Sequence, residues 1–246
     1  MHLNLFIYGY KNSKLLKLYE ILCEIEQTIG IKTSKFHYLY LLESNKANHP
    51  KDHKAKSISL KNLEIGIRSG EILSFSMGTT QDLKDLEGYF AYIQDEKHVI
   101  HPHINLHIPQ KYADIIQESL RQLIIASEAN YAFQTSTESA LAGISYLFNA
   151  GTYKVHKNEK SNFSWYTVHH NIIQQPRMIY PVNYFTQNQL LFSINDCTLW
   201  DFITKTFGKN SLKPLGQNLF VFNVSLEQLF NVNNKFSAAG FLISLC

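Results

Sequence analysis

Charged residues, arginine and cysteine are all scarce in this sequence, and each shortage excludes a class of protein. Charged residues make up 17% of the 246 residues, the net charge is +3, and the only arginines are Arg68, Arg121 and Arg177. Arginine is the side chain that forks onto phosphates and guanine edges, so the sequence predicts no nucleic-acid partner. A weakly charged surface instead favours association with another protein.

Cysteine usage and hydropathy bear on the cellular compartment. Cys23, Cys197 and Cys246 lie far apart and form no Cys-x-x-Cys pair, which is typical of reduced thiols. The first residues show no basic segment followed by a sustained apolar run, so no signal peptide is expected. No segment approaches the roughly 18 consecutive apolar residues of a transmembrane helix. We therefore expect a cytoplasmic protein with no membrane partner.

Apolar residues are abundant, and their spacing predicts both strands and helices. Hydrophobic residues make up 45% of the chain, including 16 Phe and 14 Tyr, which is enough for a core without a metal or a disulfide. Strands are predicted at 3–10, 36–42, 58–67, 71–77, 88–94, 98–108, 129–135, 178–185, 219–224 and 240–246. Helices are predicted between Ser13 and Gly30, after Pro109, after the capping-box pair Thr135 and Glu138, around Leu199, Ile203 and Phe207 after a cap at Asn195 or Asp196, and at 225–230.

The order of these elements predicts the fold class. Strands and helices are mixed without strict alternation, which favours an α+β fold with a mixed, largely antiparallel sheet flanked by helices. Strand–helix–strand patterns at 3–42 and 98–135 would also fit two similar β-α-β-containing lobes. We expect a single domain over residues 1–246, within which lobes 1–151 and 165–246 could be joined by a polar segment at 152–164.

One strand carries a row of histidines that could form a metal site. The two-residue period of a strand places His101, His103, Asn105 and His107 on one face, with His98 close by. Histidines two residues apart can ligate zinc, and a metal-activated water could support hydrolysis. The alternative is a solvated polar face, which is favoured by the edge-strand character of Pro102 and by the lack of a nearby carboxylate to orient an imidazole. We expect no metal, no cofactor and no catalytic residue here.

Other polar groups are weaker candidates for chemistry. His169 and His170 are adjacent, so in a strand their side chains would point to opposite sides. The acidic group Asp82, Asp85 and Glu87 is typical of a capped turn, with cation binding as the alternative. The basic segment 43–57 is typical of a solvated loop, with binding of an acidic partner as the alternative. No GxSxG, GxGxxG, phosphate-loop or HExxH motif is present, so we expect no enzymatic activity.

Aromatic residues gather in two stretches of the last third of the chain. Aromatic side chains anchor many protein interfaces, but they also fill cores, and both interpretations fit the sequence. The residues are Phe163, Trp165 and Tyr166 in the first stretch, and Tyr180, Tyr184 and Phe185 in the second.

The middle and end of the chain resemble a known kind of protein. An extended segment HINLHIPQ leads into a helix and then ANYAFQTSTES, and later PRMIYPVNYF precedes a helix and KPLGQNLFVFNVS. Over residues 70–230 this layout resembles immunity proteins of bacterial polymorphic-toxin and type VI secretion systems, particularly the DUF3396-like kind. The resemblance implies a cytoplasmic α+β protein that neutralises a cognate toxin by stoichiometric binding, without catalysis, and it carries over no contact residues.

Two alternatives to an immunity function stay open at this point. One is a metal-dependent hydrolase that uses His101, His103 and His107. The other is an accessory protein of a phage or mobile element that binds another host or phage protein. Metal analysis would separate the first from the rest, and a stable complex with a toxin domain would separate the immunity protein from the accessory protein.

Overall fold

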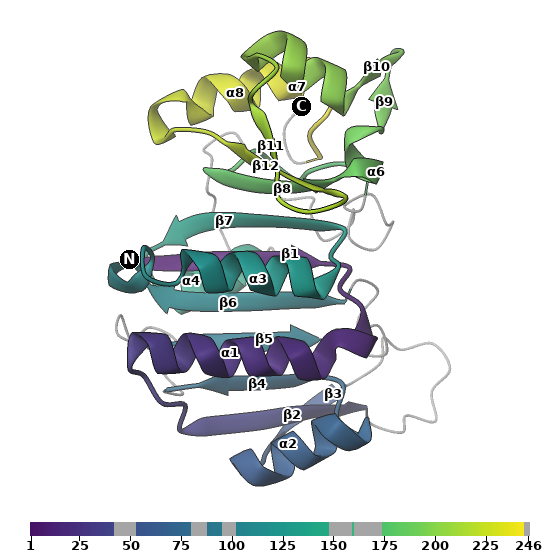
Figure 1. Ribbon diagram of the computed structural model, residues 1–246. Coiled ribbons are helices and arrows are strands. Elements are labelled where there is room, and N and C mark those ends of the chain that lie inside the picture. Colours follow the sequence, from purple (N-terminus) through teal and green to yellow (C-terminus); the bar gives the residue numbers. More distant parts are fainter. Residues whose placement is uncertain (42–52, 80–87, 95–101, 148–158, 160–173, 244–246) are drawn as a thin grey trace.

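A long antiparallel sheet with helices on both faces organises the protein (Figure 1). The computed structural model describes residues 1–41, 53–79, 88–94, 102–147, 159 and 174–243. The strands of the main sheet are β1 (His2–Tyr8), β2 (Lys35–Leu41), β3 (His53–Ser57), β4 (Phe75–Gly78), β5 (Phe90–Gln94), β6 (His103–Pro109), β7 (Tyr131–Thr137), β8 (Val182–Thr186), β11 (Leu212–Pro214) and β12 (Leu219–Asn223). Strands β9 (Ser193–Ile194) and β10 (Cys197–Thr198) form a separate hairpin.

The main sheet has ten strands in the order β11-β12-β8-β7-β1-β6-β5-β4-β2-β3. Every pairing between its described strands is antiparallel, so the predicted α+β fold with a largely antiparallel sheet is confirmed. The first strand, β1, lies at the centre between β6 and β7. Strand β7 pairs directly with β8, so hydrogen bonding continues from the first part of the chain into the last third.

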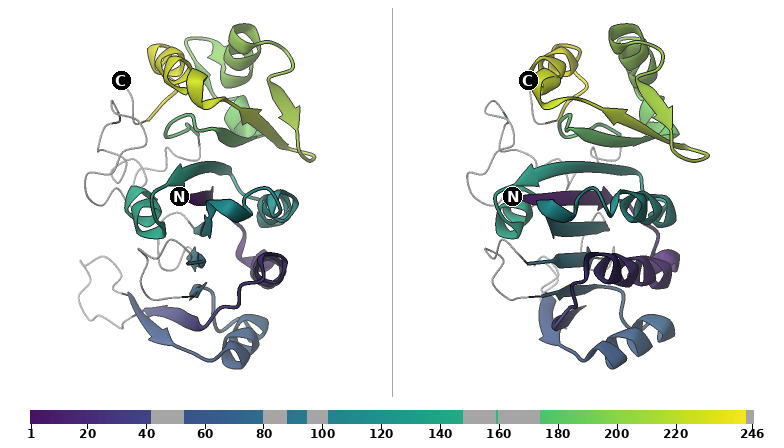
Figure 2. Two further views of the ribbon diagram at one scale, coloured as in Figure 1. Left: turned by 90° about the vertical axis from the view of Figure 1, so that its left-hand side faces the viewer. Right: turned by 60° about the vertical axis from the view of Figure 1, so that its left-hand side comes forward.

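The helices lie on opposite faces of the sheet (Figure 2). Helices α1, α2 and α3 cover one face, and α4 lies on the other. The helices are α1 (Leu15–Ile29), α2 (Leu60–Ser69), α3 (Gln117–Ser127), α4 (Ala140–Leu147), α6 (Gln187–Leu190), α7 (Leu199–Phe207) and α8 (Leu226–Ala238), with 3-10 turns η1 (Asn12–Lys14) and η2 (Gln110–Tyr112). None of the helices in the described ranges combines the length and hydropathy that a membrane span requires.

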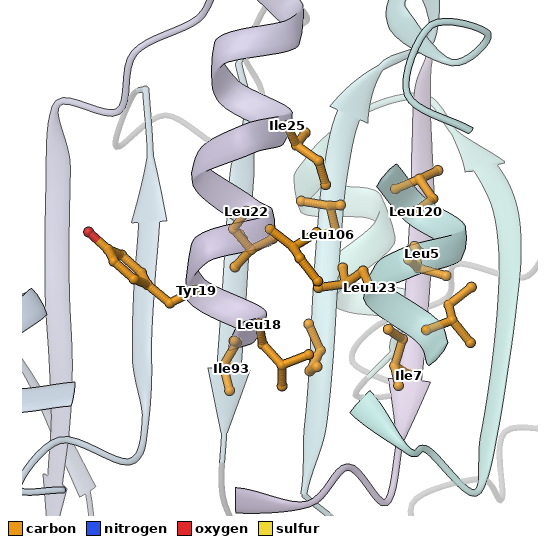
Figure 3. Packing of buried hydrophobic residues seen from close by; sticks show 14 of the residues in the cluster. Leu5, Ile7, Leu18, Tyr19, Leu22, Ile25, Ile93, Leu106, Leu120 and Leu123 are labelled. Atoms are coloured by element: carbon orange, nitrogen blue, oxygen red, sulfur yellow. The ribbon is translucent and has the colours of Figure 1, made fainter. Parts of the chain in front are cut away.

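Two hydrophobic cores lie on the two faces of the sheet. On the first face, Leu18, Leu22 and Ile25 of α1 meet side chains from β1, β5, β6 and α3 (Figure 3). These three leucine and isoleucine side chains are fully buried, as their helical spacing predicts, and Gly30 ends α1 in the left-handed conformation (φ 69°). The second core, on the other face and under α7 and α8, is rich in aromatic rings.

Several predicted elements differ from the structure. Residues 58–67 were expected as a strand, but Leu60–Ser69 form α2, capped by Ser59 and burying Leu63 and Ile67 at helical spacing. The end of the basic segment, expected as a loop, forms edge strand β3. Residues 240–243 form no strand, and 244–246 lie outside the described residues.

The helix around Leu199 and Ile203 is confirmed, but its predicted cap is wrong. Thr198 caps α7, its hydroxyl accepting from the backbone N–H of Asp201 at 3.0 Å. Asn195 and Asp196 instead have positive φ values of 49° and 60°. Two successive left-handed residues make the two-residue turn of the β9–β10 hairpin, and Asn and Asp are favoured there because their short polar side chains tolerate this conformation.

Candidate functional site

The histidine-bearing face of β6 is buried, and the prediction of a solvated face is wrong. His103, Asn105 and His107 are 5%, 1% and 0% exposed, while Ile104 and Leu106 point into the opposite core, as the predicted alternation requires. Strand β6 pairs on both sides, with β1 and β5, so it is no edge strand. His98 and His101 lie outside the described residues.

Pro102 does not disturb this central strand because it precedes the first strand residue, where no ladder hydrogen bond from its nitrogen is needed. Its carbonyl oxygen accepts a 2.7 Å hydrogen bond from the backbone N–H of Gly9. The edge-strand prediction is wrong because a proline just before a strand's first residue is compatible with a central strand.

A chain of hydrogen bonds with known directions fixes which ring nitrogen of His107 carries the proton. The amide of Asn4 donates to Thr137 Oγ1 at 2.8 Å, so its Oδ1 is an acceptor. His107 Nδ1, 2.5 Å from that oxygen, must therefore carry the proton. Gly143 of α4 closes over this pair, because a Cβ at that position would lie 2.8 Å from His107 Nδ1. Small size at Gly143 is thus what lets the helix approach the polar strand face.

Burial controls the charge of this face. Removal from water lowers the pKa of His107 to about 3, with a smaller contribution from His2. Neither side-chain amide atom of Asn105 has a hydrogen-bond partner among the described residues, and a buried unpaired polar group costs roughly 1–3 kcal/mol. His107 is therefore neutral, the face is polar and costly to bury, and a protein partner could not reach its buried residues directly.

The described residues of this face do not form a metal centre. A strand rises about 3.3 Å per residue, so the Cα atoms of His103 and His107 are roughly 13 Å apart, too far for their imidazoles to share one ion. Within the described ranges, no group of three His, Cys, Asp or Glu side chains gathers in a way that could hold a metal. The other acidic and histidine candidates, Asp82, Asp85, Glu87, His169 and His170, lie outside the described residues.

A buried ion pair lies at the centre of the second core. Arg177 and Glu159 are 1% and 2% exposed, and the guanidinium Nε donates to Glu159 Oε1 at 2.8 Å. The Tyr146 hydroxyl donates to the same oxygen at 2.8 Å, and the guanidinium lies 3.8 Å from the centre of the Tyr146 ring. Burial raises the pKa of Tyr146 well above its ordinary value, so the tyrosine stays a neutral donor and the pair is satisfied within the core.

The second aromatic stretch is divided between the two cores, with Tyr180 and Phe185 in this one and Tyr184 in the first. Tyr180, Tyr184 and Phe185 are 0%, 5% and 0% exposed, and the Tyr180 ring stacks on Phe133 with centroids 3.7 Å apart. For these three residues the core interpretation is confirmed and the interface interpretation is wrong. Phe163, Trp165 and Tyr166 lie outside the described residues.

The accessible candidate site is a polar groove of about 740 Å³ at one end of the strands. Four segments that are distant in sequence form it: the end of α3 with the turn into β7, the junction of β8 and α6, the turn between β11 and β12, and Lys11. Five of its thirteen lining residues carry side-chain amides, and Ile124, Ile125, Ala129 and Leu219 add apolar surface. The amides belong to Asn130, Gln187, Asn188, Gln217 and Asn218.

Backbone hydrogen bonds hold the walls of this groove together. The N–H of Gln187 donates to the Asn218 carbonyl at 3.0 Å, which joins α6 to the β11–β12 turn. Thr186 and Gln189 cap α6 reciprocally. On the opposite wall, the Asn130 N–H donates to the Tyr8 carbonyl at 2.9 Å. The groove is therefore formed before any partner binds.

The charges at the groove are already paired. The Glu128 carboxylate lies 2.5 Å from Lys11 Nζ and 2.9 Å from Lys14 Nζ. Hydrogen bonds from these two lysines lower the pKa of Glu128 to about 2. Hence, among its described lining residues, the groove has one small basic end and is otherwise uncharged. Sequence inspection missed this site because no single segment contributes more than a few of its residues.

Comparisons with known proteins bear on the fold. No protein-family model matches the chain, and no curated protein matches it. Among solved structures, a T6SS (type VI secretion system) protein of Pseudomonas aeruginosa has a similar fold, with a TM-score of 0.50 and 8% sequence identity. The similarity covers 98% of this chain and 73% of that chain. The likeness extends over nearly the whole chain, but at 8% identity it shows the fold alone.

Proposed function

We propose that the protein neutralises a cognate bacterial toxin of a type VI secretion system by stoichiometric binding in the cytoplasm, without catalysis. The observation that carries the proposal is the fold likeness to a T6SS protein over 98% of the chain. It coincides with the independent resemblance of residues 70–230 to immunity proteins of such systems.

Features of the described surface fit a binding protein. The groove is preformed and accessible, and its polar lining suits recognition by hydrogen bonds. Cys23 and Cys197 are free thiols, as expected in a reducing compartment. The histidine face, which motivated the hydrolase alternative, is buried at His103 and His107. No described feature favours that alternative over binding.

The proposal is tested by co-expression with the toxin domain encoded beside this gene in its source genome. Expressed alone, the domain should stop growth of a bacterial host, and co-expression of this protein should restore growth. An inactivated form of the domain should bind the purified protein at one to one in isothermal titration calorimetry. A toxic neighbour that neither binds this protein nor is suppressed by it would refute the proposal. Binding of a non-toxic phage or host protein would instead favour the accessory-protein alternative.

A further inference from the structure

The groove amides form no hydrogen bonds within the part of the protein that the structure describes. None of the side-chain amides of Asn130, Gln187, Asn188, Gln217 and Asn218 makes a hydrogen bond to another residue in the described part of the chain. Each amide has one acceptor oxygen and two donor hydrogens. Gln187, Asn188, Gln217 and Asn218 are exposed and Asn130 is partly buried, so these groups are available to a partner.

An array of side-chain amides matches the chemistry of a peptide main chain. A peptide unit presents one N–H donor and one C=O acceptor, and an Asn or Gln side chain can pair with both at once, as an unused sheet edge would. Extended segments present such units repeatedly along their length. The volume of about 740 Å³ lies within the roughly 300–1,000 Å³ of typical ligand sites, which is room for a short segment.

Other ligand classes match the lining less well. Sugars and nucleobases are commonly held by stacking on aromatic rings, and none of the described residues that line the groove is aromatic. Phosphates require free cationic donors, whereas Lys11 is paired with Glu128 at 2.5 Å. A deeply inserted apolar anchor would need a continuous hydrophobic pocket, whereas the apolar lining residues Ile124, Ile125 and Leu219 are interspersed with amides.

The sheet edge beside the groove offers few main-chain groups with which such a segment could pair. Strand β11 is only three residues long and ends in Pro214, which has no N–H to donate. Lys213 and Pro214 are exposed on this strand. A segment arriving here would find side-chain amides where an ordinary edge would offer main-chain groups.

We propose that the groove binds an extended, uncharged segment of the partner protein, and that its amides pair with the main chain of that segment. This inference rests on the proposed function for the identity of the partner, the toxin domain. The recognition chemistry itself comes from the groove and would apply to any protein that presents such a segment.

The test compares a groove variant with a matched surface variant. Asn188→Ala with Gln217→Ala removes two groove amides whose side chains make no hydrogen bond within the described part of the chain. Gln228→Ala with Asn231→Ala removes two exposed amides of α8, outside the groove. Both variants should keep the melting temperature of the wild type. Losing the paired hydrogen bonds of two amides should weaken binding of the toxin domain on the order of 10- to 100-fold, and the α8 variant should bind like the wild type.

A second probe keeps the outcome independent of the toxin. A phage-displayed library of random dodecapeptides is selected on the wild-type protein, and the selected peptides are titrated against both variants. Peptides of uncharged sequence that lose at least tenfold affinity only on the groove variant would support the inference, even if the toxin domain does not bind and the proposed function fails. A toxin domain that binds the groove variant as tightly as the wild type, or a library that yields no groove-dependent peptide, would overturn it.

Discussion

Mild acid should destabilise the protein through His107. Burial lowers the pKa of this histidine from 6.5 to about 3, so between pH 7.5 and 5.5 the imidazole stays neutral in the folded protein. In the unfolded chain it takes up a proton below its ordinary pKa. The unfolded state then binds more protons, and the free energy of unfolding must fall as the pH falls.

The size of the effect follows from the two pKa values. One pKa unit corresponds to 1.36 kcal/mol, and pH 5.5 lies one unit below the ordinary value of 6.5. Lowering the pH from 7.5 to 5.5 should therefore cost about 1.4 kcal/mol through this one residue. Ordinary carboxyl groups titrate below this window, so they contribute little to the change.

The contribution of His107 to this pH dependence is measured by urea unfolding of the wild type and of His107→Asn at pH 7.5, 6.5 and 5.5. The asparagine amide can still donate to Asn4 Oδ1 but cannot titrate. The variant should be less stable at every pH because it leaves a cavity, and its loss of stability on acidification should be smaller by about 1.4 kcal/mol. Identical pH dependence in the two proteins would refute the assignment of a neutral, buried His107.

Three further changes are each tested by urea unfolding, two at the His107 and Arg177 clusters and one at Phe207, which packs against the second core. Gly143→Ala should lower the free energy of unfolding by about 1–3 kcal/mol despite the better helix propensity of alanine, because the new methyl group meets Asn4 and His107; a stabilised variant would contradict this contact. Arg177→Met should cost about 3–5 kcal/mol because it leaves Glu159 as a buried lone charge, and adding Glu159→Gln should recover much of the loss; no recovery would show that the charge is not the cause. Phe207→Ala should cost less than the roughly 3–5 kcal/mol of a fully buried phenylalanine, because this ring is only partly buried, and a larger loss would place it deeper in the core.

Local patterns in the sequence predict much of the fold, whereas pairing and burial depend on distant residues. Helix α1 is predicted well because Leu18, Leu22 and Ile25 repeat at helical spacing and Gly30 ends the helix. Helix α2 is missed because its buried residues Leu63 and Ile67 lie among polar ones in a short segment, where helix and strand patterns are hard to separate.

The candidate site depends still more on tertiary structure. The alternation of β6 correctly separates Ile104 from His103 and His107, but it cannot say that another layer covers the polar side. The groove is built from side chains such as Asn130, Asn188 and Gln217, which no motif or periodicity distinguishes in the sequence. Only the order of the strands brings them together.

The central position of β1 affects how the protein emerges from the ribosome. Its two neighbours, β6 and β7, reach to Pro109 and Thr137, so the first strand synthesised cannot complete its pairing until the chain has grown past Thr137. At roughly 5–20 residues per second this takes roughly 7–27 seconds. Until then Leu5 and Ile7, which are buried in the finished protein, lack part of their native surroundings. Substitutions in β1 should therefore change the yield of folded protein during translation as well as its equilibrium stability.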